Sequence, residues 1–252
     1  MLRLTDMAKL GRKVRQDELE TLGAPTQSLL VDAIDDGRVA EAKALAQYTV
    51  GEGKSLHDLM CDWVWDLLTR IAQRHGEEEM YDTLRASQAT WMMKRTWKGF
   101  LTLTVEERVA VIAEMIRAHH SGPAQDGGVN VVDEGDRYAI VMDPCGSGGR
   151  MRRGDAVDGT PSRLGPPYNF GATEGAHDWS WRQSGVPYYC LHCAVNEILP
   201  MEWGGHPLWL TEYDPDARKP CAWVFYKKAE QIPDRYYERV GRKKPDAGDG
   251  RY

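Results

Sequence analysis

The sequence lacks a run of apolar residues that could cross a membrane. A spanning helix needs ~20 predominantly apolar residues, and no apolar segment of this 252-residue chain approaches that length. The first residues, Met-Leu-Arg-Leu-Thr-Asp-Met, become polar too early for a secretory signal. We therefore expect a cytoplasmic location and no membrane partner.

The chain also lacks an excess of basic residues. Its 32 Lys and Arg residues are outnumbered by 38 Asp and Glu residues, which gives a net charge of -6. Nucleic-acid binding needs a basic surface that neutralises phosphates, so we expect no nucleic-acid partner. The local basic clusters are interpreted as solvated surface: Arg150, Arg152 and Arg153, and Arg239, Arg242, Lys243 and Lys244.

Phenylalanine is scarce, with three residues against nine Trp and eleven Tyr. Trp and Tyr suit pocket walls and interfaces because each carries a polar handle, although most of them are expected in the core. The hydrophobic content of 42% and the charged content of 28% are typical of a folded globular chain. The sequence therefore predicts a sizeable hydrophobic core.

The first half of the chain has the apolar periodicity of consecutive helices. We predict helices over residues 26–36, 39–49, 55–75, 77–93 and 104–116. The second is expected to stop near Gly51 and Gly53, because Gly disfavours helix interiors, and Ser55 is expected to cap the third. Thr104 and Glu107 have the spacing of a capping box at the start of the last helix.

The second half of the chain changes pattern after a linker of turn-forming residues at 121–128. Short β-type segments follow at 129–132, 138–142, 207–213 and 219–226, and the first two are expected to form a hairpin. The predicted fold class is therefore α+β. A helical bundle over residues 1–122 precedes a mainly antiparallel α+β domain over residues 129–252, which carries the cysteine-rich site.

The chain has no nucleotide-binding glycine motif. The turn Asp-Pro-Cys-Gly-Ser-Gly-Gly at 143–149 lacks the Gly-Lys-Ser/Thr of a P-loop and the spacing of a Rossmann fingerprint. We interpret it as a turn that positions Cys145 after a strand. Glycines there allow a bound group to approach the backbone closely. The candidates for binding an anionic substrate are Gly146, Ser147, Gly148 and Arg150.

Disulfides are not expected in a cytoplasmic chain, so the five cysteines need another explanation. Cys61, in a predicted helix, is interpreted as a small buried apolar residue. A Cys-x-x-Cys pair is the commonest half of a thiolate metal site, although a zinc ribbon would have two such pairs and this chain has one. We predict a zinc site, with iron as the alternative metal, whose ligands are Cys145, Cys190, Cys193 and Cys221.

The functional hypothesis is a metal-dependent hydrolase or lyase that acts on a small anionic molecule. Zinc lowers the pKa of bound water towards ~7, and the candidates for moving protons are Glu197, His192 and Asp143. The alternative is a non-catalytic sensor or accessory protein with a structural zinc. A third hypothesis is a redox protein that uses Cys190 and Cys193. The expected partners are a small-molecule ligand and, through the helical half, a second copy of the chain.

Overall fold

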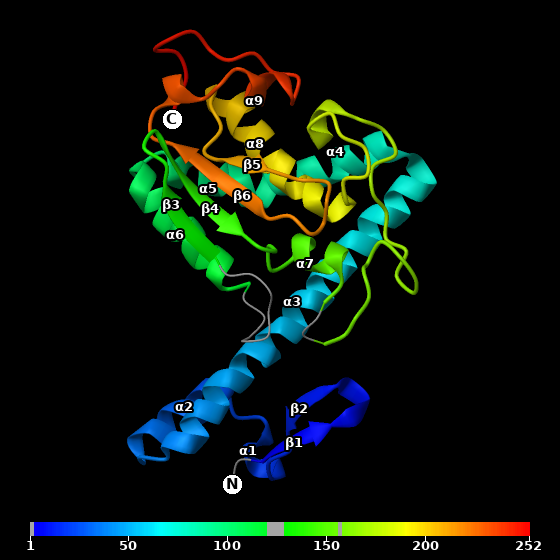
Figure 1. Ribbon diagram of the computed structural model, residues 1–252, viewed down its shortest axis with the longest axis vertical. Helices are drawn as coiled ribbons and strands as arrows, with labels where there is room; N and C mark the ends of the chain where they lie inside the picture. The colour runs from blue at the N-terminus through cyan, green and yellow to red at the C-terminus, as the bar shows by residue number, and fades with distance from the viewer. Residues whose placement is uncertain (1–2, 120–128, 156–157) are drawn as a thin grey trace.

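The computed structural model describes residues 3–119, 129–155 and 158–252, and only the backbone of Leu10 and of residues 91–94. The whole of the predicted linker, 121–128, therefore lies outside the described residues. Helices make up most of the first half of the chain and an antiparallel sheet lies in the second half (Figure 1). The predicted α+β fold class is confirmed at this level.

A small hairpin and a series of helices form the first half of the chain. The hairpin joins β1 (Leu4–Met7) to β2 (Arg12–Arg15) through a 3-10 turn, η1 (Ala8–Leu10). The helices are α1 (Leu19–Leu22), α2 (Thr26–Asp35), α3 (Val39–His75), α4 (Glu77–Ser87), the π-helical segment η2 (Gln88–Met93), α5 (Lys94–Phe100) and α6 (Val105–Arg117). Figure 1 shows the hairpin and α2 at the far end of α3, away from the sheet.

Helix α3 runs unbroken over 37 residues, so the predicted break at Gly51 and Gly53 is wrong. Neither glycine contacts a neighbouring element, since an added Cβ would meet nothing within 4 Å. Each therefore costs only its intrinsic propensity, about 1 kcal/mol, while α2 packs on one end of α3 and α4 on the other. The hydroxyl of Ser55 donates back to the carbonyl oxygen of Gly51 at 3.1 Å instead of capping a new helix.

The sheet has the strand order β3-β4-β6-β5, with every neighbouring pair antiparallel. Its strands are β3 (Val129–Asp133), β4 (Arg137–Met142), β5 (Leu210–Glu212) and β6 (Cys221–Tyr226). The predicted hairpin of the first two strands is confirmed. Helix α6 packs against β3, β4 and β6, and it opens with the predicted capping box between Thr104 and Glu107.

Short helices complete the second half: α7 (Gly148–Arg153), η3 (Asp178–Ser180), η4 (Tyr188–Cys190), α8 (Leu191–Gly204), η5 (Ala229–Gln231) and α9 (Arg235–Glu238). Helix α8 passes through Pro200 without ending there. Proline removes one backbone hydrogen bond, but Leu199 and Met201 on either side are buried and hold the helix in place. The helix stops at Gly205, which has a left-handed φ of 88°.

One hydrophobic core joins the two predicted domains. It contains Trp65 of α3 and Ile112 of α6 together with Ile140 of β4 and Leu191 of α8. A smaller separate core holds α2 against the first turns of α3. The division at residues 122 and 129 stays a prediction, and the side-chain packing of the described residues is continuous across it.

Candidate functional site

One face of the sheet forms a wall of a cavity. Met142 of β4 lies opposite Cys221 of β6, and Trp223 of β6 lies opposite Thr211 of β5. Residues that are paired across strands, or two apart along one strand, share a face. These four side chains therefore form one continuous surface, and all four line the same cavity.

The cavity has a volume of about 590 Å³ and lies between this sheet face and the helices. Its walls come from both halves of the chain: α3, α4, η2 and α6 on the helical side, and the sheet, α7 and α8 on the other. The lining is mostly apolar and aromatic, which is typical of small-molecule sites. All four cysteines of the predicted metal site line it: Cys145, Cys190, Cys193 and Cys221.

The sulfurs of these cysteines are not gathered as a ligand set. In the described part of the chain, no group of three Cys, His, Asp or Glu ligand atoms within 4.8 Å of one another includes a cysteine. Burial raises the pKa of the Cys190 and Cys193 thiols well above the usual value, and that of Cys221 to about 11. A metal would therefore have to displace thiol protons as well as draw these side chains together.

Helix α7 brings the glycine-rich turn against the cavity. The sulfur of Cys145 accepts a hydrogen bond from the backbone N–H of Gly149 at 2.9 Å. A Cβ on Gly148 would lie 2.7 Å from the sulfur of Cys190, so only glycine allows α7 to pack this closely on η4. Gly146, Ser147 and Gly148 all line the cavity, as the prediction of a substrate-binding turn requires.

The side chain of Arg152 is a buried cation of the cavity wall. It is 4% exposed, and no carboxylate of the described residues lies within 4.0 Å of it. Its Nη1 donates to the hydroxyl of Tyr213 at 2.7 Å, its Nη2 donates to the carbonyl oxygen of Asp214 at 2.7 Å, and its Nε has no partner. A buried charge without a counter-charge is costly, so an anion bound in the cavity would be stabilised by this guanidinium.

Three further buried polar atoms of the cavity lining lack a hydrogen-bond partner among the described residues: Gln88 Oε1, Trp209 Nε1 and Thr211 Oγ1. Most buried polar groups are paired, so this concentration is informative. The amide nitrogen of Gln88 donates to the carbonyl oxygen of His192 at 3.3 Å and to Oδ1 of Asn196 at 3.1 Å, which leaves Oε1 as a fixed acceptor. The cavity wall therefore contains three buried donors without a partner, counting Arg152 Nε, and one buried acceptor.

His192 is placed as a neutral base on the same wall. Its Nδ1 lies 2.5 Å from the carbonyl oxygen of Tyr189, so Nδ1 carries the proton and Nε2 keeps its lone pair. Burial lowers the pKa of His192 and keeps the ring uncharged near neutral pH. Nε2 lies 3.4 Å from the sulfur of Cys193, which pairs a base with a thiol at the cavity surface.

The other predicted proton carriers lie elsewhere. Glu197 is fully buried, accepts from the backbone N–H of Thr211 at 2.5 Å and from the indole of Trp181 at 3.2 Å, and pairs with Arg239 at 2.9 Å. The Asp143 side chain is 58% exposed. Neither residue lines the cavity. Their catalytic roles stay predictions, and the contacts of Glu197 favour a structural role in which it anchors β5.

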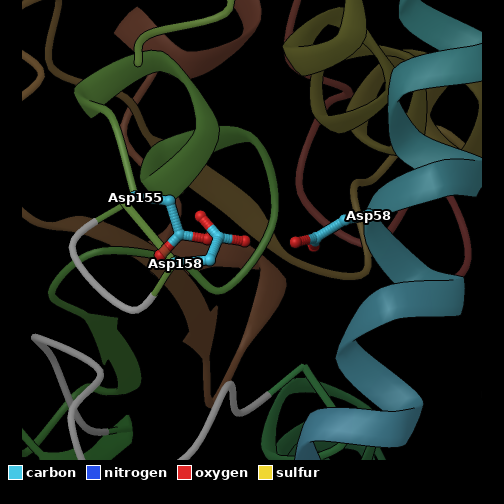
Figure 2. A group of neighbouring side chains, drawn as sticks. All are labelled: Asp58, Asp155 and Asp158. Atoms are coloured by element: carbon cyan, nitrogen blue, oxygen red, sulfur yellow. The ribbon is translucent and has the colours of Figure 1, made fainter. Parts of the chain in front are cut away.

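Arg150, predicted to bind substrate, points away from the cavity into an ionic cluster. Its guanidinium pairs with Asp58 of α3 and with Asp155. Figure 2 shows that Asp58 faces Asp155 and Asp158 across the gap between α3 and the segment after α7. These three carboxylates are a group with metal-ligand spacing in the described part of the chain.

Lys54 already supplies the cation of that acidic group. Its ammonium nitrogen lies 2.6 Å from Asp58, 2.8 Å from Asp155 and 2.6 Å from Asp158. The Lys54 side chain is only 8% exposed. The cluster is therefore neutralised by the protein itself, and we interpret it as a structural clamp between α3 and the 154–160 segment.

Comparisons with known proteins leave the site to be interpreted from its geometry. No protein-family model matches the sequence, and the searches of curated proteins and of solved structures gave no match. Among the described residues, no helix is both long and apolar enough to cross a membrane.

Arg152, the buried cation of the cavity wall, is not among the predicted site residues. Arg152 was grouped with Arg150 and Arg153 as solvated surface, although all three lie on one short helix. Residues four apart share a helix face, so Arg152 lies on the same side as Gly148, which faces Cys190. That spacing was the feature of the sequence that could have predicted where Arg152 lies. Gln88 gave none, because its fixed amide depends on contacts with α8 that are distant in sequence.

Proposed function

We propose that the protein is an enzyme, a hydrolase or lyase, that binds a small anionic molecule in the cysteine-lined cavity. The observation that carries the proposal is Arg152, a buried guanidinium of the cavity wall with no carboxylate partner among the described residues. A carboxylate or phosphate of the ligand would supply the missing counter-charge. The apolar and aromatic lining suits the rest of a small molecule.

His192 and Cys193 support a catalytic role. In the hydrolytic version, the sulfur of Cys193 attacks the substrate carbonyl and its proton passes to Nε2 of His192. The leaving group then departs with a proton from His192, and water hydrolyses the thioester. In the lyase version, Nε2 removes a proton from a carbon of the bound substrate, the C–H electron pair forms a double bond to the adjacent carbon, and a leaving group departs from that carbon with its bonding electrons. Both versions need the neutral ring that burial favours.

Metal dependence belongs to the proposal as well, in a version in which Cys193 is a metal ligand and not the nucleophile. What supports it is that Cys145, Cys190, Cys193 and Cys221 line one cavity. Zinc there would act as a Lewis acid or a source of hydroxide if three protein ligands held it, and would be structural if all four thiolates did. Native mass spectrometry of the purified protein tests this: one zinc per chain that is lost in Cys145→Ala agrees with the proposed ligand set, and a metal-free chain contradicts it.

Anion binding is tested with two alkylating agents of similar size. Iodoacetate is an anion and iodoacetamide is neutral, and peptide mapping by mass spectrometry gives the rate of each at every cysteine. We expect the ratio of the iodoacetate rate to the iodoacetamide rate at a cavity cysteine to exceed that of glutathione about threefold or more, since a buried cation favours the anion.

The control for this experiment is the same substitution at the neighbouring residue, Arg153. Arg152→Gln should lower the ratio to the glutathione value, whereas Arg153→Gln should leave it unchanged because the Arg153 side chain is partly exposed and pairs with Asp143 at 3.1 Å. A ratio equal to that of glutathione at all four cavity cysteines of the wild type would overturn the anion site.

Catalysis is tested with an activated ester that carries a carboxylate, 4-nitrophenyl hydrogen succinate, against neutral 4-nitrophenyl acetate. We expect the rate of nitrophenolate release per molecule of bound ester to be higher for the anionic ester than for the neutral one. That rate should fall at least tenfold in His192→Asn and in Cys193→Ala. Equal release by wild type and both variants would remove the hydrolytic version of the proposal.

A further inference from the structure

The middle of α3 carries a stripe of large apolar side chains that face away from the core. They are between 39% and 64% exposed: Leu56, Leu59, Met60, Trp63, Val64 and Leu67. Their spacing alternates between three residues and one, so they lie on one face of the helix. Isolated exposed apolar residues are common, but a contiguous patch marks an interaction surface.

The opposite face of the same helical segment packs inside the chain. Cys61, Trp65 and Leu68 are buried in the main core. The segment is therefore apolar on two sides, one packed within the chain and one left partly exposed by the described residues. A helix that is apolar all round is normally buried on all sides, which indicates that a further partner covers the stripe.

Four residues of the stripe have the spacing of a helix in a two-stranded coiled coil. Leu56, Met60, Trp63 and Leu67 follow each other at intervals of four, three and four, the a/d repeat of a two-stranded coiled coil, and Leu59 and Val64 flank them. We propose that the stripe is a homodimer interface, in which α3 of a second copy packs antiparallel about a twofold axis between Met60 and Trp63.

Charge at the two ends of the stripe favours this occupant and this direction. Exposed Glu52 lies four residues before Leu56 and accepts a hydrogen bond from Thr26 at 3.2 Å. Exposed Arg70 and Arg74 lie beyond Leu67, and Arg70 also pairs with Asp66 of its own helix at 2.7 Å. An antiparallel twofold pair places Glu52 of each copy opposite the two arginines of the other. A parallel pair would place like charges together, which is unfavourable.

The interface continues to the solvent-exposed edge of the cavity. Val64 of the stripe lines the cavity together with Val111 and Met115 of α6, which are 47% and 40% exposed. A second copy seated on the stripe would cover this edge and exclude water from the apolar wall. The four residues from Leu56 to Leu67 span ~17 Å along the helix. This contact is short for a helix pair, so we expect a dimer with a dissociation constant in the micromolar range.

Sedimentation velocity over a concentration series tests the proposal. The wild type should convert from monomer to dimer with increasing concentration, and Trp63→Glu should stay monomeric with an unchanged melting temperature, because Trp63 is 58% exposed. The control is Val131→Glu, which changes an equally exposed apolar residue on β3 and should dimerise like the wild type. A wild type that stays monomeric up to millimolar concentration, or a Trp63→Glu dimer of wild-type strength, would overturn the interface.

Charge exchange tests the antiparallel direction separately. Glu52→Arg should weaken the dimer severalfold, as expected for exposed ion pairs, and the triple variant with Arg70→Glu and Arg74→Glu should recover the wild-type constant. A triple variant weaker than Glu52→Arg alone would exclude the antiparallel pair.

Discussion

The Nε2 atom of His57 lies 3.5 Å from the sulfur of Cys61, one turn further along α3. On its other side, Nδ1 of the same ring lies 3.0 Å from Oδ1 of Asp58. The hydroxyl of Tyr189 lies 3.0 Å from the Cys61 sulfur. Cys61 is buried, as the sequence predicts, but it is also the centre of a polar chain that the prediction of a small apolar residue did not include.

This chain predicts a pH dependence of stability. Burial lowers the pKa of His57, but hydrogen bonds to Asp58 and Cys61 outweigh it and raise the pKa to about 9. An unfolded His titrates near ~6.5, so the stabilisation is complete below that pH and is lost as the pH rises through about 9. We expect His57→Gln to cost about 1–2 kcal/mol near neutral pH and little above the higher pKa. Urea unfolding across this range measures it, with exposed His75→Gln as the control.

A second prediction separates structure from catalysis at Glu197. Glu197→Gln should lower the free energy of unfolding by about 3 kcal/mol, because it leaves Arg239 without its buried partner. Glu202→Gln removes a more exposed carboxylate that pairs with Arg85 and Arg242 and should cost under ~1 kcal/mol. Denaturant unfolding of both variants is the measurement. A fully stable Glu197→Gln protein would contradict the structural role.

The contact between α7 and η4 predicts a matched rescue. Gly148→Ala should destabilise the protein by about 1–3 kcal/mol, since the new methyl group overlaps the sulfur of Cys190. Cys190→Ala in the same chain should restore part of that loss by removing the sulfur. Gly165→Ala, where an added Cβ meets nothing within 4 Å, is the control. Additive effects in the double-mutant cycle would show that the two residues do not touch.

The Lys54 cluster predicts a metal response in a variant. Lys54→Ala leaves three carboxylates with metal-ligand spacing and one cation fewer, so it should be less stable by about 3 kcal/mol. Calcium should raise its melting temperature and leave that of the wild type unchanged, because Lys54 occupies the position between the carboxylates in the wild type. Lys54→Ala with Asp158→Asn is the control and should lose the calcium response.

Local rules predicted local structure well. The capping box at Thr104 and the β-type segment at 138–142 each depend on neighbours in the sequence. The continuity of α3 through Gly51 and Gly53 was not predictable in this way, because packing at the two ends outweighs the local propensity.

The metal site of four cysteines stays a prediction. All four line one cavity, but the distances between their sulfurs are set by tertiary packing, and no group with metal-ligand spacing among the described residues includes a cysteine. The choice between Arg150 and Arg152 depends on the residue at which α7 begins, which a short glycine-rich helix does not signal. The unpaired atoms of Gln88 and Thr211 emerge only when a complete account of hydrogen bonds is possible.

Lys54 also joins points that are far apart along the chain. Its ammonium group links position 54 to Asp158, a separation of 104 residues, as a disulfide would in an oxidising compartment. Unlike a disulfide, this cross-link needs no oxidant, and because the Lys54 side chain is almost fully buried, salt screens it less than a surface ion pair. The attachment of Asp158 to the long helix therefore does not depend on redox potential, and it is less sensitive to ionic strength than a surface ion pair.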